Sequence, residues 1–184
     1  MEKLFIPVVL GSAREGRQSE KAARFVFDEL QKQDGVATEF VDVRDHVSGI
    51  ATVPPWGVGG ANEVPTKWKD VATRADAFIF VLPEYNHGYS GEFKLLLDSL
   101  YNEYERKPVA VCGVSAGSFG GARVIDHIKP ILVELKMIPI RNSLYFGKIK
   151  ELFDENGLLV DESVRERAES MFTDLMWHTK RLKS

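Results

Sequence analysis

The sequence predicts an α/β protein built around a parallel, doubly wound sheet. Three short segments, 4–10, 77–82 and 109–114, are almost continuously apolar. Such runs are typical of strands that are covered on both faces. The segments between them, such as 19–33, instead carry apolar residues at helical spacing. Strands that alternate with helices in this way favour a parallel sheet with helices packed on it.

Strands and helices alternate along the whole chain. The predicted strands are 4–10, 36–43, 77–82, 109–114 and 137–140. The predicted helices are 19–33, 65–75, 92–106, 121–136 and a last helix that Asp161 caps. Pro130 is expected to bend or break the fourth helix, because proline removes a backbone donor and clashes with the preceding turn. The chain has no internal repeat and no linker, so we expect one domain over residues 1–184.

Composition excludes several classes of partner. Hydrophobic residues make up 44% and charged residues 28% of the 184 residues, and the net charge is -3. This balance leaves no basic field that would attract nucleic acid. The first residues lack the long apolar segment of a signal peptide, and no stretch approaches the roughly 20 apolar residues of a membrane span. We therefore expect a cytoplasmic protein that binds neither nucleic acid nor membrane.

The single cysteine, Cys112, excludes an internal disulfide. It lies in the apolar run "PVAVCGV", residues 108–114. Since unpaired cysteine is among the most buried residue types, we expect Cys112 to be a small residue of the core.

Three distinctive polar loops follow the first, third and fourth predicted strands. They are "GSAREGRQSEK" (11–21), "PEYNHGYSGEFK" (83–94) and "SAGSFGGAR" (115–123). In doubly wound sheets the ligand lies beyond the carboxyl ends of the strands, where the strand order reverses. We therefore expect these loops to form one site. The long segment 48–65, with its Gly and Pro residues, is expected to cover or border it.

The first loop has the composition of an anion site. It joins a strand to a helix N-terminus, where backbone N–H groups and the helix dipole favour negative charge. Ser12 and Ser19 can add hydroxyl donors, and Arg14 and Arg17 can add charge-assisted hydrogen bonds. The loop is neither a P-loop nor a dinucleotide fingerprint, because GK[ST] and G-x-G-x-x-G are both absent. The alternative is a polar turn with solvated arginines and Ser19 as a helix cap.

The other two loops suit a flat ring system. Glycines in 83–91 let backbone approach a ring closely, and Tyr85 or Tyr89 can pack against it. The fourth loop combines small residues with hydroxyls and can line the opposite edge. The alternative for the third loop is an ordinary crossover turn whose tyrosines fill the core, and the alternative for the fourth is a flexible loop with glycines for turn geometry. His87 is more simply a solvent-facing histidine than an acid or base, and no ligand cluster supports a metal site.

With the three loops taken together, the chain resembles the NAD(P)H-dependent FMN reductase family of flavodoxin-like flavoproteins. The resemblance covers roughly residues 4–146. It rests on the form G-S-x-R followed by Ser in the first loop, and on P-E-Y-N with a later L-K-x-x-x-D-like stretch after the third strand. "SAGSFGGAR" and "ELKMIPIRNSLYF" follow in the family's order and spacing. The resemblance implies a flavodoxin-like three-layer sandwich, with a five-stranded parallel sheet of order 2-1-3-4-5.

The resemblance also implies non-covalent FMN as cofactor, reduced by NADPH or NADH, and no catalytic side chain. The implied phosphate ligands are Ser12, Arg14, Arg17 and Ser19. The residues implied to face the ring are Pro83, Glu84, Tyr85 and Asn86, mostly through backbone, and Ser115, Gly117 and Ser118 from the fourth loop.

Three functions are open at this point. The first is a reductase in which NAD(P)H gives a hydride to FMN, and two electrons pass to a small-molecule acceptor such as a quinone, azo compound, flavin or metal oxyanion. The second is a flavodoxin-type electron carrier, against which the two loop arginines and the mild net charge count. The third is a flavin-binding redox regulator.

A homodimer or a dimer of dimers is expected. The helix from Glu92 to Arg106 has Leu95 outside its core stripe and Tyr101 and Tyr104 near its end, and Trp56 has no evident core partner. Extra apolar surface beside a cofactor cleft suggests a partner subunit, and the family is commonly dimeric.

Overall fold

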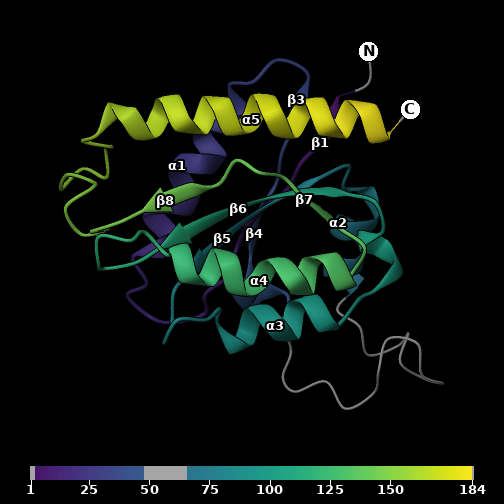
Figure 1. Ribbon diagram of the computed structural model, residues 1–184, viewed down its shortest axis with the longest axis horizontal. Coiled ribbons are helices and arrows are strands. Elements are labelled where there is room, and N and C mark those ends of the chain that lie inside the picture. The colour runs from purple at the N-terminus through teal and green to yellow at the C-terminus, as the bar shows by residue number, and fades with distance from the viewer. Residues whose placement is uncertain (1–2, 48–65, 184) are drawn as a thin grey trace.

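A parallel sheet forms the middle layer of the molecule, and helices cover both of its faces (Figure 1). The computed structural model describes residues 3–47 and 66–183. Buried residues of two helices share a core with one face of the sheet, and those of three helices share a core with the other. The first pair is α1 (Ser19–Gln31) and α5 (Glu162–Leu182); the other three are α2 (Thr66–Arg74), α3 (Gly91–Asp98) and α4 (Ala122–Glu134). The predicted three-layer sandwich is confirmed.

The strand order is the predicted one. The strands are β1 (Leu4–Phe5), β2 (Val8–Leu10), β3 (Val36–Ala37), β4 (Phe40–Asp42), β5 (Phe78–Pro83), β6 (Pro108–Val114), β7 (Ile138–Pro139) and β8 (Leu144–Phe146). The main sheet runs β4-β2-β5-β6-β7, β8 also pairs with β6, and every ladder is parallel. β1 pairs with β3 just before β2 pairs with β4. Pro7, which has no N–H, separates β1 from β2 and so divides the first predicted strand.

The fifth position of the sheet differs from the prediction because two short strands share it. β7 pairs with the start of β6 and β8 with its end. β8 was not predicted. Leu144 and Phe146 are buried and Tyr145 is 47% exposed. Alternation over three residues is too short a signal to identify a strand from sequence.

Two predicted helices also differ. The helix expected over 92–106 ends at Asp98, and a short 3₁₀ turn, Asn102–Tyr104, follows. The Ser99 hydroxyl donates to the Leu96 carbonyl at 2.7 Å, so the side chain takes an acceptor at the helix end. In contrast, α4 runs through Pro130 without a break. Its buried face, which includes Ile128 and Leu132, holds the helix against the sheet despite the missing donor.

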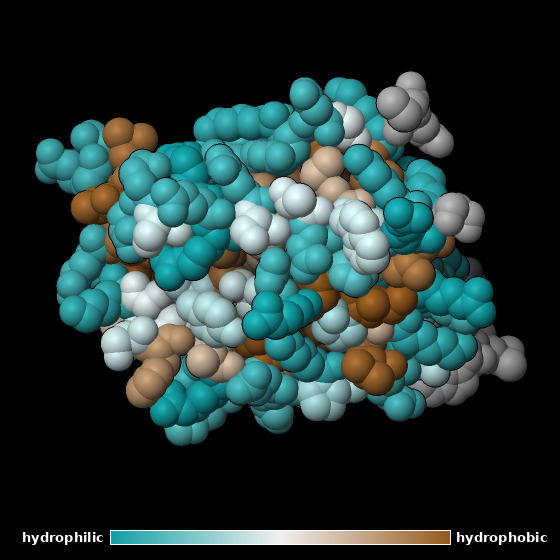
Figure 2. Space-filling view, turned by 45° about the horizontal axis from the view of Figure 1, so that its top comes forward, coloured by the Kyte–Doolittle hydropathy of each residue, from teal (hydrophilic) through white to brown (hydrophobic). Residues whose placement is uncertain are grey.

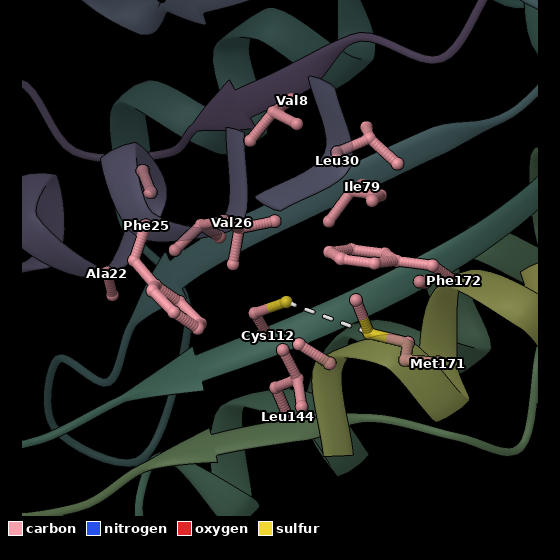
Figure 3. Packing of buried hydrophobic residues seen from close by; sticks show 14 of the residues in the cluster. Val8, Ala22, Phe25, Val26, Leu30, Ile79, Cys112, Leu144, Met171 and Phe172 are labelled. Carbon is pink, nitrogen blue, oxygen red and sulfur yellow. Dashed lines mark hydrogen bonds between the residues drawn. The ribbon is translucent and has the colours of Figure 1, made fainter. Parts of the chain in front are cut away.

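The core between the sheet and α1 and α5 contains Cys112, as predicted (Figure 3). The Cys112 sulfur lies 4.0 Å from the Met171 sulfur, with Phe25 and Phe172 in the same cluster. Burial raises the pKa of the Cys112 thiol far above its ordinary range. Cys112 is therefore an inert packing residue.

On the other face, one aromatic residue lies where the sequence did not place it. Tyr104 is fully buried, and its hydroxyl accepts a hydrogen bond from the Trp68 indole at 2.9 Å. Its predicted contribution to an exposed apolar surface is therefore wrong. Trp56 and the rest of 48–65, predicted to cover the site, lie outside the described residues. Within 3–47 and 66–183, no helix is both long and apolar enough to cross a bilayer.

Candidate functional site: three loops at the carboxyl edge of the sheet

The three distinctive loops meet at one edge of the sheet. They follow β2, β5 and β6, which are adjacent and parallel, so their carboxyl ends point the same way. Hydrogen bonds join the loops. The Ser12 and Tyr85 hydroxyls lie 2.7 Å apart, and the Ser90 hydroxyl donates to the Gly11 carbonyl. The Glu84 amide donates to the Val114 carbonyl at 2.8 Å.

Ser12, Arg14 and Tyr85 form a connected group. Ser12 is fully buried, and its oxygen also accepts from the Arg14 amide at 3.3 Å. The Arg14 guanidinium lies over the Tyr85 ring, 3.9 Å from the ring centre. Arg14 is exposed, and the described part of the chain offers its guanidinium no carboxylate partner. This charge is available to an anionic ligand, whereas the Ser12 hydroxyl mainly ties the first loop to the third.

Arg17 is placed differently. Its side chain is 3% exposed and lies against the Asp42 carboxylate at the end of β4, with one nitrogen 2.9 Å from Oδ1 and the other in contact with Oδ2. It also bonds to Glu20 at 3.2 Å and to the Ser12 carbonyl. Burial alone would raise the pKa of Asp42, but hydrogen bonds from Arg17 and from the Arg44 amide hold it below its ordinary value. The charge of Arg17 is therefore engaged in holding the loop.

Ser19 is the first residue of α1, and its side chain is buried. The residue before it, Gln18, makes no side-chain cap. Ser19 is 2% exposed, and its oxygen has no hydrogen-bond partner among the described residues. An unsatisfied buried hydroxyl costs about 1–3 kcal/mol. Its position at a helix N-terminus, among amides that favour an anion, fits a phosphate group as the missing partner. Ser19 is not the simple helix cap that the alternative reading required.

The third loop makes a tight turn directly after β5. Pro83 is the last, buried residue of β5, and the Tyr85 and Gly88 backbones exchange hydrogen bonds of 2.9 and 3.0 Å. The two residues between them, Asn86 and His87, both have positive φ, 50° and 68°. Two central residues of positive φ are what a type I′ turn requires, and asparagine and histidine tolerate this conformation better than most residues. The polar stretch after β5 is therefore a tight turn at the carboxyl edge, and its two central residues are exposed.

The Glu84 side chain caps a helix. The residue before α4, Gly121, has no side chain to cap the helix N-terminus. Glu84 takes this role: its carboxylate accepts from the Arg123 amide at 3.2 Å and lies 3.5 Å from the Arg123 guanidinium. Glu84 therefore connects the third loop to the helix that follows the fourth.

Two hydrogen bonds to the Gly117 carbonyl hold the fourth loop. The Ser115 hydroxyl donates to the Gly117 carbonyl at 3.0 Å, and the Lys148 amide donates to the same carbonyl at 2.9 Å. Gly121 has φ 79°, and a Cβ there would lie 2.5 Å from the Val114 nitrogen, so only glycine fits. Gly117 and Ser118 are exposed beside these contacts. These contacts give the fourth loop a defined conformation.

Sequence reasoning missed three residues that hold the first loop. Asp42 and Arg44 come from the end of β4, and Glu92 from the first turn of α3. The Glu92 carboxylate accepts from the Ala13 amide at 2.8 Å. The stretch "DVRD" at the end of the predicted edge strand could have indicated Asp42 and Arg44, since the carboxyl end of that strand lies at the same edge of the sheet as the three loops.

Together the fold and these loops define a flavodoxin-like protein whose three loops meet at the carboxyl edge of the sheet, beside the N-terminus of α1. The model of the NADPH-dependent FMN reductase family matches residues 6–151. The chain therefore belongs to the NADPH-dependent FMN reductase family, whose members are oxidoreductases that use FMN with NAD(P)H.

Individual relatives agree with this assignment. An NAD(P)H-dependent FMN reductase of Pseudomonas aeruginosa is 31% identical over 122 residues, which is 64% of this chain and 66% of that protein. A quinone reductase of Pseudomonas putida is 31% identical over 168 residues and 86% of each chain. Among solved structures, the flavoenzyme NAD(P)H:(acceptor) oxidoreductase FerB of Paracoccus denitrificans superposes with a TM-score of 0.76 at 21% identity. That superposition covers 97% of this chain and 98% of FerB, and at this identity it supports the fold alone.

Proposed function

We propose that this protein is an NAD(P)H-dependent reductase whose two-electron acceptor is a quinone. The observation that carries the cofactor site is the buried Ser19 hydroxyl at the N-terminus of α1, which has no hydrogen-bond partner within residues 3–47 and 66–183. Arg14 of the same loop adds a charge that has no carboxylate partner in those ranges. The choice of a quinone follows the Pseudomonas putida relative, which is a quinone reductase. Azo compounds, free flavin and metal oxyanions are the other acceptors to compare.

The residues divide into those that bind FMN and those that hold the binding loops. Ser19, Arg14 and the amides around them bind the phosphate in this proposal. The backbone of 83–86 and of 115–118 frames the ring. When bound, FMN accepts a hydride from NAD(P)H and returns two electrons to the acceptor. The protein would supply binding and orientation, so that the nicotinamide could lie against the ring.

Two measurements on the purified protein test the cofactor and its reduction, and a third, steady-state turnover, tests the acceptor. Heat release followed by chromatography identifies the flavin, and we expect FMN and not FAD. Anaerobic rapid mixing with NADPH, and separately with NADH, follows the flavin band, and we expect direct and complete reduction without a partner protein. Steady-state turnover is then measured with a panel of quinones. Double-reciprocal plots of rate against NAD(P)H at several quinone concentrations should be parallel, because nicotinamide and acceptor use the same ring face in turn.

Each measurement has an outcome that contradicts the proposal. FAD, or no flavin after reconstitution, would exclude the cofactor site. A bound FMN that stays oxidised for minutes with both nicotinamides would instead indicate an electron carrier of the flavodoxin type on the same fold.

We also propose a homodimer or a dimer of dimers. Phe119 and Val133 are 65% and 61% exposed, and Leu95 and Tyr101 are only partly buried. On the face in Figure 2, hydrophobic residues lie in separate patches among hydrophilic ones. A partner subunit would therefore contact either another face or an interface of both hydrophobic and polar residues. Light scattering at micromolar concentration tests this, and a monomer would contradict it. A cytoplasmic location remains a prediction from the sequence.

A further inference from the structure

Arg44 reaches from the end of β4 to the first loop. It lies in the short 3₁₀ turn Val43–Asp45. Its Nε donates to the Ala13 carbonyl at 2.8 Å, and a terminal nitrogen donates to the Arg14 carbonyl at 2.6 Å. Two successive carbonyls of the loop are thus held by one planar guanidinium, in charge-assisted hydrogen bonds.

These bonds set the direction of two peptide units. In a trans peptide, the carbonyl of one residue and the amide N–H of the next point opposite ways. The amides of Arg14 and Glu15 therefore point away from Arg44. The Arg14 amide does point away from Arg44, because it donates to the Ser12 hydroxyl oxygen at 3.3 Å. The Glu15 amide has no acceptor in the described portion of the protein.

Successive amides that face one side of a loop form a concavity that binds anions. The preceding peptide unit does not contribute, because the Ala13 amide donates to Glu92 and the Ser12 carbonyl accepts from Arg17. The orientation of the next two units then depends on Arg44. Its own backbone amide is anchored on Asp42 Oδ1 at 3.0 Å. The position of Arg44 is thereby tied to the same carboxylate that binds Arg17.

We propose that Arg44 is a positioning residue for the phosphate site. By holding the Ala13 and Arg14 carbonyls outward, it keeps the Arg14 amide on the Ser12 hydroxyl and turns the Glu15 amide toward the phosphate of FMN, without touching the phosphate itself. The inference rests on the proposed FMN site, which the unpaired Ser19 hydroxyl supports independently.

The test compares the binding of FMN and riboflavin, which differ only in the phosphate. Both are titrated into the full-length apoprotein carrying Arg44→Ala, Arg44→Lys or the control Arg74→Ala. Arg74 is also an exposed arginine, but it pairs with Glu39 and lies over the Phe5 ring in β1. We expect Arg44→Ala to weaken FMN about tenfold, or about 1.4 kcal/mol, and to leave riboflavin within about twofold. Arg44→Lys should be intermediate, since lysine keeps the charge but not the fork. Arg74→Ala should bind both ligands as the wild type does.

A second readout separates positioning from direct contact with the phosphate. Trypsin cleavage after the exposed Arg14 is measured by mass spectrometry in the absence of any flavin. Positioning predicts that Arg44→Ala is cleaved several-fold faster there than the wild type at equal melting temperature. Unchanged cleavage with weaker FMN binding would show that Arg44 touches the phosphate and would overturn the inference. So would equal loss of FMN and riboflavin, or unchanged FMN binding.

The outcomes also separate this inference from the proposed reaction. If wild-type protein binds FMN with the expected Arg44 dependence but neither nicotinamide reduces it, the reductase proposal fails and the inference stands. If FMN is reduced normally and Arg44→Ala binds it as the wild type does, the inference fails alone.

Discussion

Replacing Arg14 and Arg17 by alanine, one at a time, separates two roles that look identical in the sequence. Both arginines lie in the first loop. Arg14 is exposed without a carboxylate partner in the described residues, whereas Arg17 is buried against Asp42 and Glu20. We expect Arg14→Ala to affect FMN binding and Arg17→Ala to affect folding.

The expected magnitudes follow from these contacts. Removing one member of a buried ion pair costs about 3–5 kcal/mol. The Asp42 and Glu20 side chains remain 19% and 40% exposed, so water compensates part of the loss. We therefore expect Arg17→Ala to lower the free energy of unfolding by about 2–3 kcal/mol, which is about 5–10 °C in melting temperature. Arg14→Ala should lose at most about 0.5–1 kcal/mol from its contact with the Tyr85 ring.

The effect on ligand binding should be selective for FMN in Arg14→Ala and not in Arg17→Ala. Loss of a charge-assisted hydrogen bond to phosphate costs about 1.5–3 kcal/mol. Arg14→Ala should therefore weaken FMN roughly tenfold or more and leave riboflavin almost unchanged. Arg17→Ala should weaken both ligands alike, because the whole loop loses its support.

Melting of the apoprotein and quenching of flavin fluorescence measure the two effects on the same samples. Asp42→Asn is the matched control, since it removes the charge that Arg17 faces and keeps the side-chain shape. It should melt lower, as Arg17→Ala does. If Arg17→Ala melts like the wild type but loses FMN selectively, Arg17 leaves Asp42 to bind the phosphate and our reasoning is wrong. Equal loss of FMN and riboflavin in Arg14→Ala would likewise refute a contact between Arg14 and the phosphate.

Two further predictions concern buried polar groups. Ser19→Ala should raise the free energy of unfolding of the apoprotein by up to about 1 kcal/mol, because it removes an unsatisfied hydroxyl. It should also weaken the binding of FMN several-fold. Lower stability together with unchanged FMN binding would contradict the role given to Ser19. Burial against Trp68 lowers the pKa of His46 below its ordinary 6.5, so the unfolded state binds more protons and stability should fall as pH drops through about 6.5. Denaturant unfolding at a series of pH values from about 7.5 to about 5 should show this fall in the wild type and a smaller fall in His46→Phe. Equal slopes of the free energy of unfolding against pH in the two proteins would exclude His46 as its source.

The layers of the fold and the position of the candidate site could be predicted from the sequence. Continuous apolar runs identify buried parallel strands, and right-handed crossovers leave few ways to connect them. The order of the sheet and the meeting of the loops after β2, β5 and β6 follow from that connectivity. Local patterns of this kind extend over a few neighbouring residues, so a single sequence is enough to read them.

The contacts of the individual polar side chains could not be predicted from the sequence. Arg17 and Asp42 are 25 residues apart, and Glu84 and the amide it caps on α4 are 39 apart. Nothing near Ser19 in the sequence shows that its hydroxyl is buried without a partner. Such pairings depend on which strands are adjacent and on their register, because a side chain's partner is set by distance in space and not along the chain. For this reason the sequence could name the arginines of the first loop but could not show that Arg17 is paired with Asp42, whereas Arg14 has no carboxylate partner within 3–47 and 66–183.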